Sequence, residues 1–282
     1  MKANVNGVSL RYAIDGPSGA PWVTFANSLL TDLRIWDGQV GALESDYRVL
    51  RYDHRGHGLS GASGGAYTLE LLADDLLALL DALGIHQTHV VGVSIGALTG
   101  AYAAHRDPRR FVTVTMADCQ PRSTPASRQL WLGRASSARQ HGLAEIVDES
   151  IVRWFGPDFR AAKPRLVSEY RSMMESTSVD GYVGCAHAIS DHDARRRVAA
   201  LAMPKLFLAG EHDGTSPQVL GELSGETPSA RFAVIPGAGH LSNVEGSRHF
   251  TSELRAFLDE HPPDARAPAS QTAGAHEEGR LP

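Results

Sequence analysis

The sequence predicts an α/β fold in which helices flank a mostly parallel central sheet and one helical segment is inserted between two strands. Short apolar runs rich in β-branched and aromatic residues alternate with segments of helical periodicity, which is typical of parallel strands joined by crossover helices. This alternation stops between about residues 123 and 198, where apolar residues recur only at helical spacings. A chain of 282 residues is long enough for one large domain with such an insertion.

The strands and helices of the predicted core follow from local patterns. Strands are predicted at residues 8–12, 22–26, 47–52, 89–93, 111–116, 205–209 and 231–235. A helix is predicted over 69–83, where leucines recur with three- and four-residue spacing and Gly84 follows as a stop. A further amphipathic helix is predicted over about 247–258, with Phe250, Leu254 and Phe257 on one side.

These patterns divide the chain into a core, a cap and a tail. The core comprises residues 1–122 and 198–261, and the helical segment 123–197 is expected to cap it. Ligands of open α/β sheets bind beyond the carboxyl ends of the strands, so a segment inserted there can cover a site. A second small core without a functional role is the alternative for this segment. Residues 262–282 are rich in Pro, Ala, Gly and charge, and we expect a disordered tail.

Composition excludes several classes of protein. The chain has 27 Lys plus Arg against 32 Asp plus Glu, a net charge of −5, and no long basic stripe, so nucleic acid is not an expected partner. Its apolar stretches are only strand length and its N-terminus lacks a secretory h-region, so no membrane association is expected. Cys119 and Cys185 are too few for a disulfide framework, which favours the cytoplasm.

The first chemical motif is Gly92-Val93-Ser94-Ile95-Gly96, which follows a predicted strand and opens a helix-compatible run. A G-x-S-x-G motif between strand and helix is the nucleophile elbow of serine hydrolases. The serine adopts a strained backbone conformation there, and side chains two residues either side would collide with the neighbouring strand and helix. The start of the helix also directs backbone amide donors toward the reacting oxygen. Ser94 is therefore the predicted nucleophile.

A serine hydroxyl needs a base, and the base needs an orienting carboxylate, in the chain order Ser, Asp, His. Asp213 follows the predicted strand 205–209, and His240 lies in a glycine-rich loop after the strand 231–235. Parallel strands bring their carboxyl ends to one edge of the sheet, so these residues and Ser94 can converge. Glu211, two residues before Asp213, is the competing carboxylate.

Further stretches carry a resemblance to a known family. They include Asn-Ser-Leu at 27–29, Arg-Gly-His-Gly at 55–58, Arg-Trp-Phe at 153–155 and His-Leu-Ser-Asn-Val-Glu at 240–245. With the elbow, they make the chain resemble α/β-hydrolases and, within them, the 3-oxoadipate enol-lactonases. The resemblance covers most of the core from residue 5 to about 258. Arg-Gly-His-Gly is common across the superfamily, whereas the first and last stretches are more particular to the lactonases.

The resemblance implies an α/β-hydrolase fold and several site residues. The backbone N–H groups of Leu29 and Ile95 would form the oxyanion hole. The lactone of these relatives carries a free carboxylate, and burying that charge requires a partner such as a guanidinium. Arg134 falls where the family has Trp-x-x-Arg, Arg122 lies nearby, and Trp154 belongs to the matching Arg-Trp-Phe stretch. Surface positions for both arginines are the alternative.

The chain also departs from the family pattern. Leu30 replaces a glycine beside the oxyanion loop, and Ala97 replaces a second glycine after the elbow. The run Asp-Cys-Gln-Pro-Arg at 118–122 replaces a segment that in relatives reads closer to Asn-Thr-Ala-Ala-Arg. Since this edge is expected to face the substrate, the accepted lactone can differ from that of the family.

The predicted function is therefore a serine hydrolase that opens a small carboxylate-bearing lactone, most simply 3-oxoadipate enol-lactone. A carboxylesterase or C–C bond hydrolase acting on another small acid is one alternative, and a ligand-binding module without turnover is another. Acyl transfer of this kind needs no metal and no cofactor. His187, Asp191, His192 and Asp193 have spacing that could hold a metal, but the polar end of a cap helix explains them more simply. Monomer and homodimer both stay open.

Overall fold

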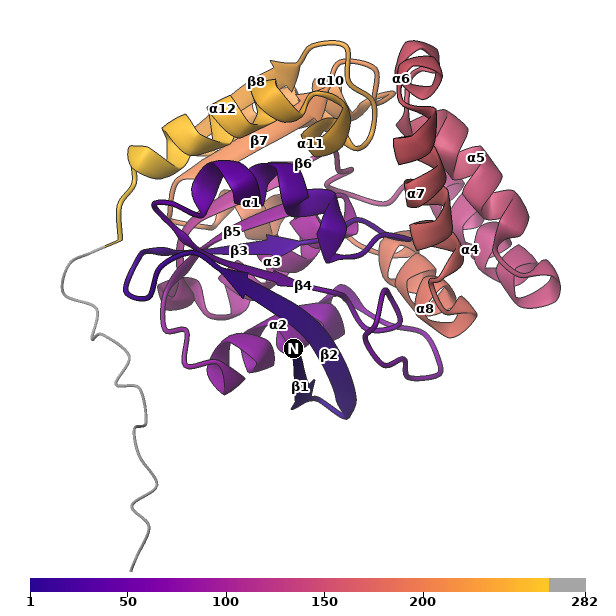
Figure 1. Ribbon diagram of the computed structural model, residues 1–282, viewed down its shortest axis with the longest axis horizontal. Coiled ribbons are helices and arrows are strands. Elements are labelled where there is room, and N and C mark those ends of the chain that lie inside the picture. The colour runs from indigo at the N-terminus through magenta and orange to yellow at the C-terminus, as the bar shows by residue number, and fades with distance from the viewer. Residues whose placement is uncertain (264–282) are drawn as a thin grey trace, which may run out of the picture.

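The structure, a computed structural model, describes residues 1–263 of the chain, and Figure 1 shows a central sheet with helices on both faces and a separate group of helices at one end. The sheet has the strand order β1-β2-β4-β3-β5-β6-β7-β8. The strands are β1 (Lys2–Val5), β2 (Val8–Asp15), β3 (Trp22–Ala26), β4 (Arg48–Tyr52), β5 (Thr88–Val93), β6 (Phe111–Ala117), β7 (Lys205–Gly210) and β8 (Ala230–Ile235). From β4 to β8 all neighbouring strands are parallel, so their carboxyl ends share one edge.

Helices cover both faces of this sheet. Figure 1 shows α1 (Asp37–Leu43) and α12 (Ser247–Asp259) on one side, and α2 (Leu69–Ala82) and α3 (Ile95–Arg106) on the other. Helix α10 (Ser216–Glu226) packs on β7 and β8. The short elements η1 (Leu33–Trp36), η2 (Pro108–Arg110) and α11 (Ser242–Glu245) lie in the connections. This doubly covered sheet confirms the predicted fold class.

The predicted strands are all present, with ends that differ by at most three residues. The structure adds β1, which pairs antiparallel with β2, and β2 in turn pairs antiparallel with β4. The predicted helix at 69–83 corresponds to α2, whose first turn is capped by the Thr68 side chain accepting from Leu71 N. The helix predicted at about 247–258 corresponds to α12, and Phe250, Leu254 and Phe257 form its buried side.

Between β6 and β7 the chain forms only helices, which we call the cap. They are α4 (Pro125–His141), α5 (Ala144–Trp154), α6 (Pro157–Ala162), α7 (Pro164–Glu175), α8 (Val179–Ser190) and α9 (Arg195–Ala199). Figure 1 shows α4 to α8 standing together beyond the end of the sheet, where α4 packs against α8 and α5 against α7. The predicted tail, residues 262–282, lies outside the described residues apart from its first two positions.

Close backbone approach joins the cap to the core. A Cβ atom on Gly181 of α8 would lie 2.5 Å from the Cα atom of Gly56, and Gly56 itself has a φ of +75°. The backbone N–H of Ser178 donates to the carbonyl of Gly56 at 3.0 Å, and that of Tyr67 donates to the carbonyl of Gly184 at 3.1 Å. Two facing glycines therefore allow α8 to sit directly on the loop after β4.

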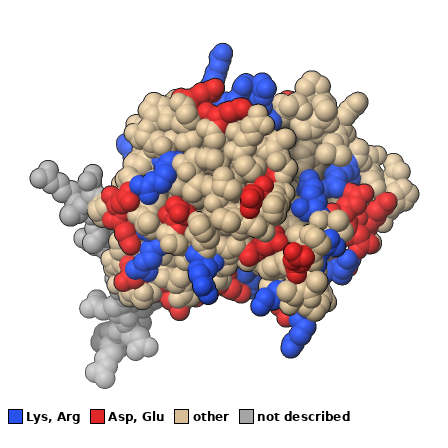
Figure 2. All heavy atoms as spheres, turned by 90° about the horizontal axis from the view of Figure 1, so that it is seen from above, with Lys and Arg blue, Asp and Glu red and all other residues tan. Residues whose placement is uncertain are grey.

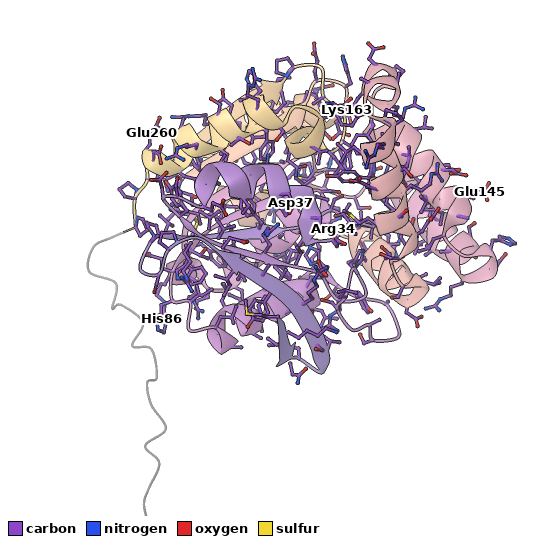
Figure 3. The ribbon with its side chains drawn as sticks, viewed as in Figure 1. Arg34, Asp37, His86, Glu145, Lys163 and Glu260 are labelled. Atoms are coloured by element: carbon purple, nitrogen blue, oxygen red, sulfur yellow. The ribbon has the colours of Figure 1, made fainter. Side chains whose placement is uncertain are left out.

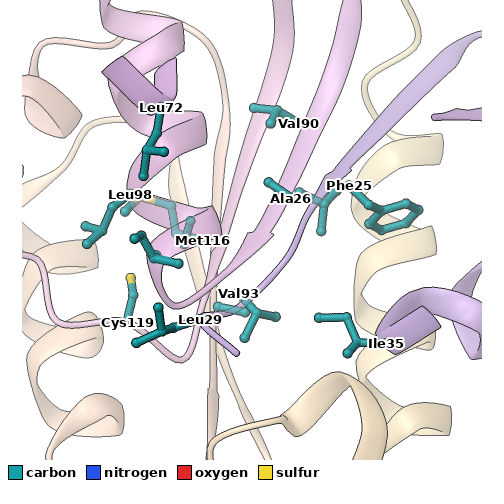
Figure 4. Close-up of a cluster of buried hydrophobic side chains, with 14 of the residues drawn as sticks. Phe25, Ala26, Leu29, Ile35, Leu72, Val90, Val93, Leu98, Met116 and Cys119 are labelled. Atoms are coloured by element: carbon teal, nitrogen blue, oxygen red, sulfur yellow. The ribbon is translucent and has the colours of Figure 1, made fainter. Parts of the chain in front are cut away.

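The apolar core extends to the edge of the sheet where the cap begins. Figure 4 shows Phe25, Leu29, Val93, Leu98 and Met116 gathered around the ends of β3, β5 and β6, and all are buried. Lys, Arg, Asp and Glu are mixed over the face in Figure 2, without a large area of one sign. No helix within residues 1–263 has the length and apolar character needed to cross a membrane.

Candidate active site

Ser94 occupies a sharp turn between β5 and α3. Its φ of +57° and ψ of −120° lie in a region that residues other than glycine rarely adopt. The backbone N–H of Ser94 donates to the carbonyl of Ala117 at 2.8 Å, and its own carbonyl accepts from Leu98 N at 3.2 Å. These bonds anchor the turn to β6 and to the first turn of α3, so the strained conformation is held on both sides.

The two glycines of the elbow are required by close packing. A Cβ atom on Gly92 would lie 2.3 Å from the backbone carbon of Gly96, and one on Gly96 would lie 2.2 Å from the carbonyl oxygen of Ala26. Neither contact is possible for a real side chain, which is the reason expected for a G-x-S-x-G motif. Ala97, by contrast, is accommodated with its methyl group buried.

His240 and Asp213 form a hydrogen-bonded pair at the same edge of the sheet. The His240 Nδ1 atom lies 2.9 Å from Asp213 Oδ1. Burial by itself would raise the pKa of Asp213, but the charge of His240 and its hydrogen bond hold it below its usual value. Glu211, the competing carboxylate, instead accepts from the backbone N–H of Gly237 at 2.8 Å. Asp213 is thus the carboxylate that orients the imidazole.

One pocket of about 410 Å³ brings the three predicted catalytic side chains together. Ser94, Asp213 and His240 all line it, with residues of α4 and α5 from the cap on the other side. Among the residues that the structure describes, no hydrogen bond joins Ser94 Oγ to His240 Nε2. The bond between a nucleophile and its base is often long before substrate binds.

The predicted oxyanion donors lie beside the elbow. Leu29 and Ile95 are buried, and within residues 1–263 neither backbone N–H donates to a protein acceptor. Ile95 is the first residue of α3, so its N–H is one of the donors that a helix start leaves free. Leu30, where the family resemblance expects glycine, has a φ of +62° and is buried. The left-handed conformation of that position is therefore kept with a large side chain.

Of the three residues predicted to bind substrate, the structure places only one in the lining of the catalytic pocket. Arg122 lines the catalytic pocket. Trp154 does not line that pocket; it is buried and packs against His240, with ring centroids 5.6 Å apart. Arg134 forms an ion pair with Glu149 and lines another pocket, which it shares with Glu145. Figure 3 labels Glu145 at the outer end of the cap. Arg134 does not line the catalytic pocket, so the structure does not bring it to the triad candidates.

Two residues of the pocket that carry a formal charge, Arg153 and Asp118, were not identified from the sequence as site residues. Arg153 of α5 lines the same pocket as the triad candidates. Its only sequence signal is its place in the Arg-Trp-Phe stretch at 153–155. Asp118, at the end of β6, also lines the pocket and is fully buried. Its position in the altered run 118–122 was the available signal.

Asp118 connects the two loops that carry Asp213 and His240. Its Oδ1 accepts from Gly210 N at 2.8 Å, and its Oδ2 accepts from Ser242 N at 3.0 Å and from Ser242 Oγ at 2.6 Å. Burial raises the pKa of Asp118 well above its usual value, and the nearby Asp213 raises it further, while the three donors oppose this. One carboxylate therefore ties the end of β7 to the loop after β8.

The polar residues near the end of α8 have protein partners. The ring nitrogens of His192 lie 2.8 Å from the carbonyl of Ile189 and 3.0 Å from that of Gln120. Asp193 pairs with Arg195, and Asp191 pairs with Arg128. Within residues 1–263, no group of three or more His, Cys, Asp or Glu side chains is arranged to hold a metal ion.

Comparison with known proteins agrees with the fold and shows the family of the chain. The sequence model described as the alpha/beta hydrolase fold matches residues 21–247. Two 3-oxoadipate enol-lactonases of Acinetobacter baylyi are similar to the chain: number 1 is 33% identical over 92% of this chain and 96% of its own length. Number 2 is 34% identical over 89% of this chain and 93% of its own length.

Solved structures superpose on nearly the whole chain. The enol-lactonase from Burkholderia xenovorans superposes with a TM-score of 0.88 at 37% identity, covering 92% of this chain and 100% of that protein. A thermophilic esterase from Thermogutta terrifontis, solved with malate bound, superposes with a TM-score of 0.86 at 26% identity, covering 93% and 97%.

Proposed function

The chain belongs to the alpha/beta hydrolase fold family, and from this premise we propose that it is a serine hydrolase that opens a small carboxylate-bearing lactone, 3-oxoadipate enol-lactone to 3-oxoadipate. The identity of about a third to enol-lactonases over nearly the whole chain supports the reaction class and the substrate. The observation that carries the proposal is the hydrogen-bonded His240–Asp213 pair in one pocket with the strained Ser94.

In the proposed reaction, His240 takes the proton of the Ser94 hydroxyl as Oγ attacks the lactone carbonyl carbon. The tetrahedral oxyanion accepts hydrogen bonds from the N–H groups of Leu29 and Ile95. The ring C–O bond then breaks, and the leaving enolate, which is part of the same molecule, takes the proton from His240 and becomes a ketone, so the imidazole is neutral again. Asp213 keeps the imidazole in the required tautomer and stabilises its protonated form.

The second half of the reaction hydrolyses the acyl-enzyme. His240 takes a proton from water, the new hydroxide oxygen bonds to the acyl carbon, and the Ser94 oxygen leaves with the proton that His240 returns. Every step uses side chains and backbone groups of this chain, so we propose that the enzyme works without metal or cofactor.

A carboxylesterase acting on another small acid is a second candidate. Two observations favour it: Leu30 fills a buried position beside the oxyanion loop where glycine is expected, and the esterase from Thermogutta terrifontis is similar over 93% of the chain. Such an esterase would use the same triad as the lactonase, and only the shape of the accepted substrate would differ between the two.

The test is the ultraviolet decay of 3-oxoadipate enol-lactone with purified wild-type protein and with Ser94→Ala, alongside a 4-nitrophenyl ester. We expect fast loss of the lactone that falls by about 10⁴-fold or more in Ser94→Ala while circular dichroism and thermal unfolding stay unchanged. Cleavage of the ester alone would leave a serine hydrolase and remove the lactone. No turnover of either substrate would favour a ligand-binding module.

A further inference from the structure

A carboxylate-bearing substrate needs a cation in the pocket, and the structure narrows the choice among the arginines of the cap. Arg134 is paired with Glu149 and does not line the catalytic pocket. Arg122 lines the pocket, but it also lies near Asp193, whose pKa it helps to lower after the larger effect of Arg195. Arg153 lines the pocket too, and among residues 1–263 its guanidinium forms no ion pair or hydrogen bond.

The surroundings of Arg153 leave its charge unneutralised. The nearby protein and the positive charge of Arg134 lower the pKa of Arg153, and Asp213 raises it. Because Asp213 raises the pKa of Arg153, the two groups lie close enough for their charges to interact. Asp213 is also hydrogen-bonded to His240. Arg153 also lies over the ring of Trp131, 6.0 Å from its centroid, and Trp131 lines the same pocket, so this contact supports the guanidinium at the pocket wall.

The backbone that carries Arg153 is fixed relative to His240. Trp154, the next residue, packs its ring against the imidazole. Two residues further on, Gly156 N donates to Glu245 Oε1 at 2.9 Å, while Glu245 Oε2 accepts from Gly239 N at 2.7 Å. The segment 153–156 is therefore attached to the His240 loop at Trp154 and at Gly156. A cation mounted on such a segment has a defined distance to the reacting serine, which favours binding of an anion at one end of a substrate.

We propose that Arg153 is the substrate-binding residue that holds the free carboxylate of the substrate, so that the pocket selects acyl groups with an anion at their far end. Opening the enol-lactone gives an acyl-enzyme whose chain ends in a carboxylate, and the guanidinium of Arg153 can bind it by donating two parallel N–H···O bonds to its oxygens. This inference rests on the proposed function for the reaction itself, but it concerns a residue that the sequence did not single out.

A matched pair of substrates tests this directly. The 4-nitrophenyl monoester of adipic acid and its methyl ester have acyl chains of the same length and differ only in the terminal charge. We expect Arg153→Met to lower kcat/KM for the anionic ester by about 10- to 100-fold and for the methyl ester by less than about 3-fold. Arg153→Lys is expected to restore part of the loss, because it keeps the charge without the planar fork.

The control for loss of one positive charge from the cap is Arg165→Met, which removes an exposed arginine of α7. It is expected to leave kcat/KM unchanged for both esters. Equal losses for the two esters in Arg153→Met would overturn the assignment, and so would a selective loss in Arg134→Met alone. Calorimetric binding of adipate keeps this question separate from turnover. Adipate affinity that depends on Arg153 supports the anion site even if no ester is cleaved, and affinity independent of it contradicts the site.

Discussion

The indole of Trp154 and the imidazole of His240 pack with their ring centroids 5.6 Å apart and their planes 34° apart. Trp154 belongs to the cap and is only 1% exposed, so the last turn of α5 covers the candidate catalytic base. Glu245 supports the same arrangement, because its two carboxylate oxygens accept from Gly239 N and from Gly156 N. The cap therefore contributes to the position of His240 as well as to the wall of the pocket.

Trp154→Ala is expected to affect turnover and stability together. Removing a buried indole leaves a cavity that costs about 3–5 kcal/mol of unfolding free energy. It also frees one face of the imidazole, so we expect kcat to fall by about 10-fold or more, whereas Trp154→Phe retains an aromatic face and most of the activity. Steady-state kinetics and urea unfolding of both variants measure this. A folded Trp154→Ala protein with wild-type kcat would show that the cap does not position His240.

The core and the triad candidates could be predicted from sequence because their signals are local. The elbow needs glycine at 92 and 96 for packing reasons that hold in any strand–turn–helix, and Asp213 and His240 follow strands that are recognisable by composition. Strand β1 was missed because it is short, shows no apolar run and buries only Val5 of its four residues. Its antiparallel pairing with β2 depends on the turn at Asn6 and Gly7, both with positive φ.

The sequence predicts that the cap is helical, but it does not predict which faces of the cap helices point toward the pocket. Arg134 and Arg153 both lie on amphipathic helices of the cap, and sequence spacing cannot tell which of them faces the pocket. That choice depends on the packing of α4 against α8 and on the Glu149 partner of Arg134. The role of Asp118 was equally hidden, because its three donors come from residues 92 and 124 positions away along the chain.

Gly181→Ala is expected to loosen the cap. The new Cβ would lie 2.5 Å from the Cα and carbonyl oxygen of Gly56, so α8 or the loop after β4 must move. We expect faster proteolysis within residues 123–197 and a higher KM, with a loss of unfolding free energy of about 1–3 kcal/mol. Gly133→Ala in α4, where a Cβ meets nothing within 4 Å, is the matched control and is expected to be neutral or slightly stabilising. Identical behaviour of the two variants would contradict the proposed tight approach.

The protein is expected to lose stability in mild acid because of buried neutral histidines. Burial lowers the pKa of His54 to about 3 and of His57 and His89 to about 4. The unfolded chain takes up these protons near pH 6.5, whereas the folded chain does so only near the lowered values. The stabilising contribution is therefore present above pH 6.5 and is lost as pH falls from there toward 4, at about 1.4 kcal/mol per pH unit for each histidine.

Urea unfolding at pH 7, 6 and 5 measures this slope. His89→Gln removes one of the three groups and is expected to make the slope shallower by about one third, even if the variant is less stable at pH 7. His249→Gln removes a half-exposed histidine of α12 and is expected to leave the slope unchanged. Equal stability of the wild-type protein at pH 7 and pH 5 would contradict the neutral state of the three buried rings.

Asp118→Asn is expected to reduce kcat more than it changes KM. An asparagine offers one acceptor oxygen and one N–H₂ donor, so it cannot accept from Gly210 and from Ser242 at the same time. Gly210 lies three residues before Asp213, and Ser242 lies two residues after His240, so the lost bond shifts one partner of the pair relative to the other. A shift of this kind affects proton transfer from Ser94 and leaves the walls of the pocket in place. We expect kcat to fall by about 10- to 100-fold.

Ser242→Ala separates positioning from a general loss of stability. It removes only the hydroxyl bond to Asp118 and keeps both backbone N–H donors, so its cost is expected to be about 1 kcal/mol of unfolding free energy with kcat reduced less than 5-fold. If Asp118 positions the pair, Asp118→Asn reduces kcat far more than Ser242→Ala does at equal distance below the melting temperature of each variant. If the fall in kcat of each variant simply follows its loss of stability, Asp118 has only a structural role. If kcat falls selectively in Asp118→Asn, Asp118 holds the Asp213 and His240 loops together.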